Sequence, residues 1–104
     1  DLASLMRLAS CVVVLSKSEG FAFPALEALA CGAPVLVARD SAQAELAGPV
    51  GISVDSADPA SVADGFERAL RERENLRYDG IDRAALFTWD ACAERVEALW
   101  RRLA

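Results

Sequence analysis

The sequence predicts an α/β protein built on a parallel β-sheet. The first observation is a pair of short, continuous apolar runs, CVVVLS at 11–16 and APVLVA at 33–38, which are typical of strands covered by helices on both faces. The second is the order strand, helix, strand with short connections, the pattern of right-handed crossover units. The third is a change after residue 58, from where only helical patterns follow. We therefore expect about three strands flanked by helices, followed by a helical C-terminal part.

The first half of the chain supplies the strands and the helices between them. A helix ahead of the strand 11–16 is indicated by apolar residues at helical spacing: Leu2, Leu5, Met6 and Ala9. Pro24 suits the first turn of the next helix, because it has no N–H to leave unbonded, and Gly32 suits its end, so this helix runs over about 24–31. After the strand 33–38, RDSAQAELAG indicates a polar loop with room for a helical turn. GISVD (51–55) indicates a third, shorter strand.

The second half is predicted to be helical throughout. Asp58 is a suitable N-cap and Pro59 a suitable first residue for a helix whose apolar face would comprise Val62, Phe66, Ala69 and Leu70. A shorter helical piece surrounds Gly80. Thr88 can cap a last helix with the strongest periodic stripe of the chain, formed by Trp89, Cys92, Ala93, Val96, Leu99, Trp100 and Leu103. We expect this stripe to pack in a core rather than to bind a cofactor.

Composition narrows the class of protein. With 104 residues, of which 54% are hydrophobic, the chain is about one domain long and can fill a core. The net charge of −5 argues against nucleic acid as a partner. No apolar run could span a bilayer, and the N-terminal residues do not resemble a secretion signal. We therefore expect a cytoplasmic protein.

The residue types argue against a metal site and against a disulfide framework. The chain has no His, which is the usual general base at neutral pH and the usual zinc ligand. Its three cysteines, Cys11, Cys31 and Cys92, are widely spaced among apolar neighbours, which fits neither a disulfide framework nor a metal cluster. We expect buried, reduced thiols and no metal site.

The loop KSEGFAF (17–23) is the candidate binding segment. It follows the strand 11–16 and leads into the helix that starts near Pro24, and ligands of parallel α/β sheets lie at this end of the strands. Unbonded N–H groups around Phe23 to Leu26, other than Pro24, would face a phosphate at the positive end of the helix dipole. Gly20 allows close approach of the backbone to a ligand.

Two acidic residues, Glu19 and Glu27, bracket this segment. Glu27, in about the first turn of the helix, could bind a vicinal pair of hydroxyl groups such as those of a ribose, and Glu19 could bind another polyol such as a hexose. The spacing alone also fits a simpler role, because a carboxylate near a helix N-terminus stabilises the helix.

The stretch SEGFAFPALEALACGAPVLV (18–37) closely resembles the EGFGLPxLEAMAxGxPVV signature of retaining GT-B glycosyltransferases of the family four group, which use nucleotide sugars. The resemblance continues in order through LASLMRLASCVVVLS (2–16), AELAGPVGISVDSADPASVADGFERAL (44–70) and DRAALFTWDACAERVEALW (82–100). It implies that residues 1–104 are a single partial domain, the C-terminal segment of a nucleotide-sugar-binding, Rossmann-like domain.

The resemblance also implies roles for individual residues. Glu19, the candidate catalytic residue, would approach the donor sugar, and Glu27 would hold the ribose hydroxyls. The substrate-binding backbone would comprise Gly20, Phe21 and Ala22 at the sugar, and Phe23 and Ala25 at the diphosphate. Transfer of the sugar from a UDP or GDP sugar would retain the anomeric configuration and need neither metal nor other cofactor.

Two positions depart from the family signature. Ala22 replaces its second Gly and adds a methyl group where a sugar would lie close, which could change the choice of donor or mark lost activity. Gln43 and Ala44 replace a frequent Leu-Pro pair before Glu45, which we interpret as a change in a loop.

Other parts of the site are expected elsewhere. The family's phosphate-binding Arg and Lys and its N-terminal acceptor domain would precede residue 1, and near the candidate segment only Lys17 and Arg39 are close in sequence. We expect residues 1–104 alone to be inactive, and in isolation to expose surfaces through which copies could pair. A peripheral membrane contact of the full protein stays open. A non-catalytic nucleotide-sugar-binding module and a structural α/β module are the alternatives.

Overall fold

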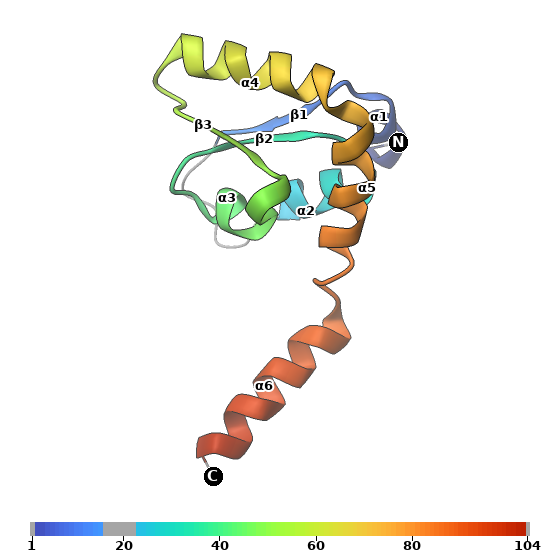
Figure 1. Ribbon diagram of the computed structural model, residues 1–104. Helices are drawn as coiled ribbons and strands as arrows, with labels where there is room; N and C mark the ends of the chain where they lie inside the picture. Colours follow the sequence, from blue (N-terminus) through green and yellow to red (C-terminus); the bar gives the residue numbers. More distant parts are fainter. Residues whose placement is uncertain (1, 16–22, 104) are drawn as a thin grey trace.

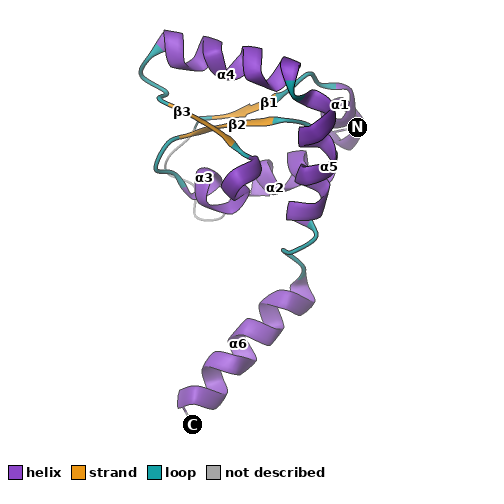
Figure 2. Cartoon of the chain, viewed as in Figure 1, coloured by secondary structure: helices purple, strands orange, loops and turns teal. Residues whose placement is uncertain are grey.

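The computed structural model describes residues 2–15 and 23–103, and within them a three-stranded parallel sheet with helices on both faces (Figure 1). Figure 2 shows that helices make up most of this part of the chain. The elements follow in the order α1 (Leu2–Leu8), β1 (Val12–Val14), α2 (Phe23–Ala30), β2 (Val35–Ala38), α3 (Ala42–Ala47), a 3₁₀ turn η1 (Gly48–Val50), β3 (Ile52–Val54), α4 (Pro59–Arg71), α5 (Arg73–Ala84) and α6 (Trp89–Leu103). The predicted Rossmann-like α/β class, with a partial sheet, is confirmed.

The strands lie in the order β1, β2, β3, which places β2 in the centre. Val13 pairs with Leu36, and Val37 pairs with Ser53, both in parallel register. A right-handed crossover between neighbouring strands that advances in one direction places consecutive helices on the same face of the sheet. Accordingly α2 and α3 lie together on one face and α4 covers the other (Figure 1).

The side chains of β2 point alternately to the two faces of the sheet, which divides the core into two clusters. Val35 and Val37 face α2 and α3, where they pack with Ala25, Ala28 and Leu29, all nearly or fully buried. Leu36 points to the opposite face and packs with a cluster that comprises Ile52, Val54, Ala69 and Leu76. Because β2 is covered on both sides, all four of its residues are buried, as its continuous apolar run predicted.

The expectation that β1 is covered on both faces is wrong. Val13 is 42% exposed, whereas Val12 and Val14 are half-buried against the α2 side. Val13 lies on the same face as its partner Leu36. On that face α4 packs over β2 and β3, so it leaves the middle of β1 uncovered.

Helix α2 ends as its sequence predicted. Gly32 adopts a left-handed conformation with φ of 80°. Its N–H donates to the carbonyl of Leu29, and the N–H of Ala33 donates to the carbonyl of Ala28, both at 3.0 Å. This pair of bonds is the Schellman arrangement, which satisfies the last carbonyl groups of a helix and favours Gly at the left-handed position.

Helix α4 begins as predicted but presents a different face to the sheet. The Asp58 carboxylate accepts a hydrogen bond from the Ala60 N–H at 3.0 Å, and Pro59 follows as the first helical residue. The predicted apolar face is wrong at Phe66 and Leu70, whose side chains are 40% and 61% exposed. Gly65 is buried instead, because the absence of a side chain there lets the helix approach the sheet closely.

Helix α6 contradicts the core packing predicted for its apolar stripe. Thr88 caps the helix as expected, since its Oγ1 accepts from the Ala91 N–H at 3.0 Å. The helix, however, extends away from the sheet and its covering helices (Figure 1). The stripe residues whose exposure is described are largely open to solvent: Ala93, Val96, Leu99, Trp100 and Leu103.

Candidate functional site

The starts of α2 and α3 meet at the carboxyl end of the sheet. Helix α2 follows β1, and α3 follows β2, so both helices begin at the edge where parallel α/β sheets bind ligands. Their first turns are joined by a hydrogen bond from the Ala25 N–H to the side-chain Oε1 of Gln43, at 3.2 Å. This contact brings together two segments that lie 18 residues apart in the sequence.

Gln43 is the most deeply buried polar residue at this edge. Its side chain is 0% exposed, and its Oε1 accepts the Ala25 N–H. Because Ala25 is the third residue of α2, this N–H has no acceptor inside the helix, and Gln43 takes the place of a helix cap. The Nε2 group of Gln43 is buried and has no hydrogen-bond partner among the described residues. Since the Ala25 N–H is a donor, it fixes which end of the carboxamide faces α2.

The connection from β2 to α3 holds Gln43 in place. The Ser41 hydroxyl donates to the Ala38 carbonyl at 2.6 Å and accepts from the Ala44 N–H at 3.1 Å, so it ties the end of β2 to the start of α3. Ser41 is 6% exposed. Asp40 precedes it with φ of 60°, in the left-handed region. The Arg39 N–H donates to the Val54 carbonyl at 2.9 Å, which adds β3 to the same edge.

Helix α5 supports α3 from behind. The Arg83 guanidinium donates from Nε to the Leu46 carbonyl at 2.9 Å and from Nη2 to the Glu45 carbonyl at 3.4 Å. It also lies 5.3 Å from the centre of the Phe87 ring, within the range of a cation–π contact. The last carbonyl groups of α3 therefore have a charged donor, which is favourable at a helix C-terminus.

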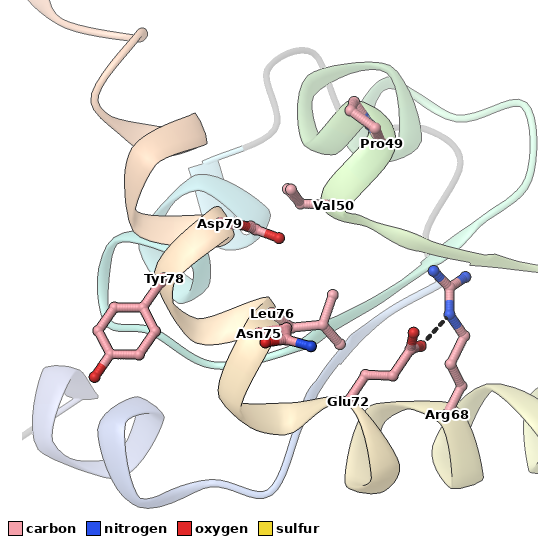
Figure 3. A pocket seen from close by; sticks show the side chains of 8 residues that line it. All are labelled: Pro49, Val50, Arg68, Glu72, Asn75, Leu76, Tyr78 and Asp79. Atoms are coloured by element: carbon pink, nitrogen blue, oxygen red, sulfur yellow. Dashed lines mark hydrogen bonds and ion pairs between the residues drawn. The ribbon is translucent and has the colours of Figure 1, made fainter.

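A pocket of about 330 Å³ lies elsewhere, between η1, α4 and α5 (Figure 3). Its lining residues are Pro49, Val50, Arg68, Glu72, Asn75, Leu76, Tyr78 and Asp79. Figure 3 shows Arg68 directed at Glu72, with which it forms an ion pair, and Tyr78 directed away from the others. Because η1 precedes β3 and Arg68 and Glu72 lie at the end of α4, the pocket is at the amino end of the strands. It contains none of the residues that the sequence predicted for a site.

The described residues offer no group of three or more Cys, Asp or Glu side chains placed to hold a metal ion. Over the same residues, no helix has the length and apolarity needed to cross a bilayer.

Comparison with known proteins identifies the family. The family model described as "Glycosyl transferases group 1" matches residues 1–85. This chain belongs to the group 1 glycosyl transferases. The resemblance of its sequence to family four GT-B glycosyltransferases is thereby confirmed.

Curated relatives match this chain along nearly its whole length. It is 36% identical over 105 residues to a D-inositol 3-phosphate glycosyltransferase from Corynebacterium diphtheriae, covering 96% of this chain and 25% of that protein. It is 42% identical over 106 residues to a D-inositol 3-phosphate glycosyltransferase from Frankia alni, covering 97% of this chain and 26% of that protein.

A third relative carries a different name. The MMP alpha-(1->4)-mannosyltransferase of Mycolicibacterium hassiacum is 33% identical over 110 residues, covering 98% of this chain and 26% of that protein. The chain thus spans about a quarter of the length of these relatives.

The glycosyl transferase signature lies partly outside the described residues. Glu19, Gly20, Phe21 and Ala22 fall in 16–22, as does Lys17, so the roles expected for these residues at the donor sugar stay predictions. Phe23 is the first residue of α2, as expected for the start of this helix. Arg39 is exposed directly after β2, at the carboxyl edge of the sheet.

Two expectations about α2 need correction. Glu27 is exposed, but it is the fifth residue of α2 and not part of its first turn, so the helix dipole stabilises it less than predicted. Ala25 is 0% exposed and its N–H is bonded to Gln43, so in this structure it does not offer the free amide predicted for a diphosphate. With Pro24 lacking an N–H, the first turn of α2 has fewer free backbone donors than the sequence indicated.

Sequence reasoning missed Gln43 and Ser41. The segment 39–48 was expected to be mainly a polar loop, and Gln43 to mark a change in that loop. Instead Ser41 caps α3, and Gln43, Leu46 and Ala47 form its buried face. The spacing of these three residues, at i, i+3 and i+4, was the available signal, but the polar type of Gln43 hid it.

Proposed function

We propose that the complete protein containing this chain transfers a sugar from a nucleotide-sugar donor, a UDP or GDP sugar, to an acceptor, and that this chain supplies donor-binding residues. The observation that carries the proposal is the coincidence of the family match with the meeting of α2 and α3 at the carboxyl end of the sheet. The names of the relatives, which include a mannosyltransferase, support transfer of a hexose.

The proposed roles follow the geometry of α2. Glu27 projects into solvent from its second turn and binds the ribose hydroxyls, which a carboxylate can accept as a pair. The start of the helix faces the diphosphate, where the positive end of its dipole favours an anion. Glu19 approaches the donor sugar, together with the backbone of Gly20, Phe21 and Ala22.

Catalysis in this proposal rests on stabilising the departing nucleoside diphosphate. Negative charge grows on the phosphate as the sugar leaves, and donors already oriented toward it lower the barrier. Transfer proceeds with retention of configuration and without a metal ion. Residues 1–104 alone are inactive, because the acceptor site and the phosphate-binding cations lie in the rest of the protein.

Calorimetry of the complete protein with UDP and GDP sugars tests the proposal. We expect binding of one of these donors, and at least tenfold weaker binding in Glu27→Ala, since loss of a charged hydrogen-bond acceptor costs about 1.5–3 kcal/mol. Glu67→Ala is the matched control, because Glu67 is exposed on α4, which covers the other face of the sheet. It should bind the donor as the unaltered protein does.

The outcomes separate the alternatives. Binding without hydrolysis or transfer of the sugar would favour a non-catalytic nucleotide-sugar-binding module, for which Ala22 is the specific observation. If the unaltered protein binds no UDP or GDP sugar, the proposed function is wrong and a structural α/β module remains. Full activity in the presence of a chelator is expected for the metal-free mechanism.

A further inference from the structure

The carboxamide of Gln43 is the least explained polar group in the described part of the chain. It is 0% exposed, and its Nε2 is the buried side-chain nitrogen without a hydrogen-bond partner among the described residues. Buried donors in folded proteins nearly always have a partner, and one that is left unpaired weakens the fold. An unpaired donor at this position therefore calls for an acceptor that is not part of the described chain.

The position of this donor indicates the kind of acceptor. Oε1 of the same carboxamide is 3.2 Å from the Ala25 N–H, so the carboxamide lies against the first turn of α2. The two ends of a carboxamide are separated by only about 2–3 Å, which keeps Nε2 close to the helix start as well. The positive end of the helix dipole and an unpaired N–H donor there both favour an oxygen anion.

The carboxamide also changes which group is offered to a ligand. By accepting the Ala25 N–H, it removes one backbone donor from the start of α2. The Nε2 group of the same carboxamide is the buried donor that remains without a partner among the described residues. Ser41 holds the arrangement, because its two hydrogen bonds fix the start of α3, where Gln43 is the second residue.

We propose that Gln43 is a ligand-binding residue whose Nε2 donates a hydrogen bond to a phosphate oxygen of a diphosphate held at the start of α2. This inference rests on the proposed function for the identity of the ligand, a nucleoside diphosphate or its sugar derivative. It assigns to the side chain of Gln43 the contact that the sequence had assigned to the backbone of Ala25.

Three variants of the complete protein test the role of the donor. Gln43→Met removes both polar ends and keeps a similar volume. Gln43→Glu keeps an acceptor for the Ala25 N–H but removes the donor and adds a negative charge. Asn75→Asp is the matched control, because it makes the same chemical change at an exposed carboxamide on α5, in the pocket at the other end of the strands.

Calorimetry with inorganic pyrophosphate, UDP, GDP and uridine provides the readout. We expect Gln43→Met to weaken binding of pyrophosphate and of the nucleoside diphosphate about tenfold or more. Gln43→Glu should weaken it further, because the added carboxylate repels the phosphate. Asn75→Asp should leave it unchanged. The affinity for uridine, which has no phosphate, should be the same in all variants.

Other results would overturn the inference. Unchanged binding in Gln43→Met would show that the donor is not used. Tighter binding in Gln43→Met would show that the carboxamide competes with the ligand for the Ala25 N–H instead of adding to the site. An equal loss for uridine and for pyrophosphate would indicate a general disturbance of the fold, and the inference would be wrong.

The same measurements separate this inference from the proposed function. If the protein binds a nucleotide sugar through Glu27 but Gln43 is without effect, only the inference fails. If pyrophosphate binding depends on Gln43 but no nucleotide sugar binds, only the proposed function fails. If the unaltered protein binds none of these ligands, both are wrong.

Discussion

A side chain added at Gly65 of α4 would collide with Val54 of β3. An ideal Cβ at Gly65 lies 2.7 Å from Cγ1 of Val54 and 3.2 Å from Cδ2 of Leu36. Distances below 3.0 Å do not occur between real side chains of this kind. Close contact between α4 and the sheet therefore depends on this glycine.

Gly65→Ala is expected to destabilise the protein. Overpacking a core costs about 1–3 kcal/mol, which outweighs the roughly 1 kcal/mol that Ala gains over Gly inside a helix. A net loss of about 1 kcal/mol should appear as a lower midpoint in urea unfolding of the complete protein.

Gly80→Ala is the matched control for this prediction. Its Cβ would lie 3.2 Å from Cδ2 of Leu29, a smaller overlap than the 2.7 Å at Gly65, which a shift of a few tenths of an ångström would relieve. We expect no loss of stability, or a small gain from helix propensity. A Gly65→Ala protein as stable as Gly80→Ala would contradict the close packing of α4.

Ser41→Ala removes both hydrogen bonds that join β2 to α3. The hydroxyl donates to Ala38 and caps the helix at Ala44, and loss of a helix N-cap costs about 1 kcal/mol. The buried Ala38 carbonyl also loses its donor, so we expect a total loss of about 1–2 kcal/mol in unfolding experiments.

Ser41→Asp keeps an acceptor for the Ala44 N–H but removes the donor to the Ala38 carbonyl, and Ser56→Ala provides the control. Asp can accept from the Ala44 N–H, but when ionised it cannot donate to the Ala38 carbonyl and it places a buried negative charge against that oxygen, so Ser41→Asp should be less stable than Ser41→Ala. Ser56 is exposed in the turn after β3, and its substitution should have no effect. Equal stability of Ser41→Ala and Ser56→Ala would disprove the role of the cap.

Burial raises the pKa of the Cys11 thiol above its ordinary value. The thiolate is the reactive form, so the folded protein should react with iodoacetamide more slowly than the unfolded chain at about pH 8. The folded state holds the proton more tightly than the unfolded state, so this group should also lower stability as the pH rises above the ordinary thiol pKa.

A protein that retains only Cys11, with Ser in place of Cys31 and Cys92, isolates this effect. The rate of reaction with iodoacetamide should rise with pH in both the folded protein and the protein unfolded in urea. In the folded protein this rise should occur at higher pH. Faster labelling of the folded than of the unfolded protein would show that Cys11 is an activated thiol, contrary to the prediction.

Local signals in the sequence were sufficient for most of the fold. The run at Val35–Ala38 predicted the central strand because burial on both faces requires a continuous apolar stretch. Pro24 and Gly32 marked the start and end of α2, since each suits one end of a helix for a steric reason that holds in any tertiary context.

Features that depend on contacts with distant parts of the chain could not be predicted from local signals. The periodic stripe of α6 indicates that one face is apolar but not what covers it, so Trp100, at 70% exposed, was wrongly assigned to a core. Gln43 was missed for the opposite reason. A buried polar residue is understandable only when its partner is known, and the N–H of Ala25 lies 18 positions away.

The left-handed backbone at Asp40 explains why an Asp occupies this position. Among side chains, only those of Asn and Asp adopt a φ of 60° with comparative ease, and Gly does so without a side chain. An acidic residue at the carboxyl end of a parallel sheet would ordinarily be considered a candidate binding or catalytic residue. Here the shape of the main chain already accounts for the residue type, so Asn or Gly at position 40 would be an equally good solution for the turn.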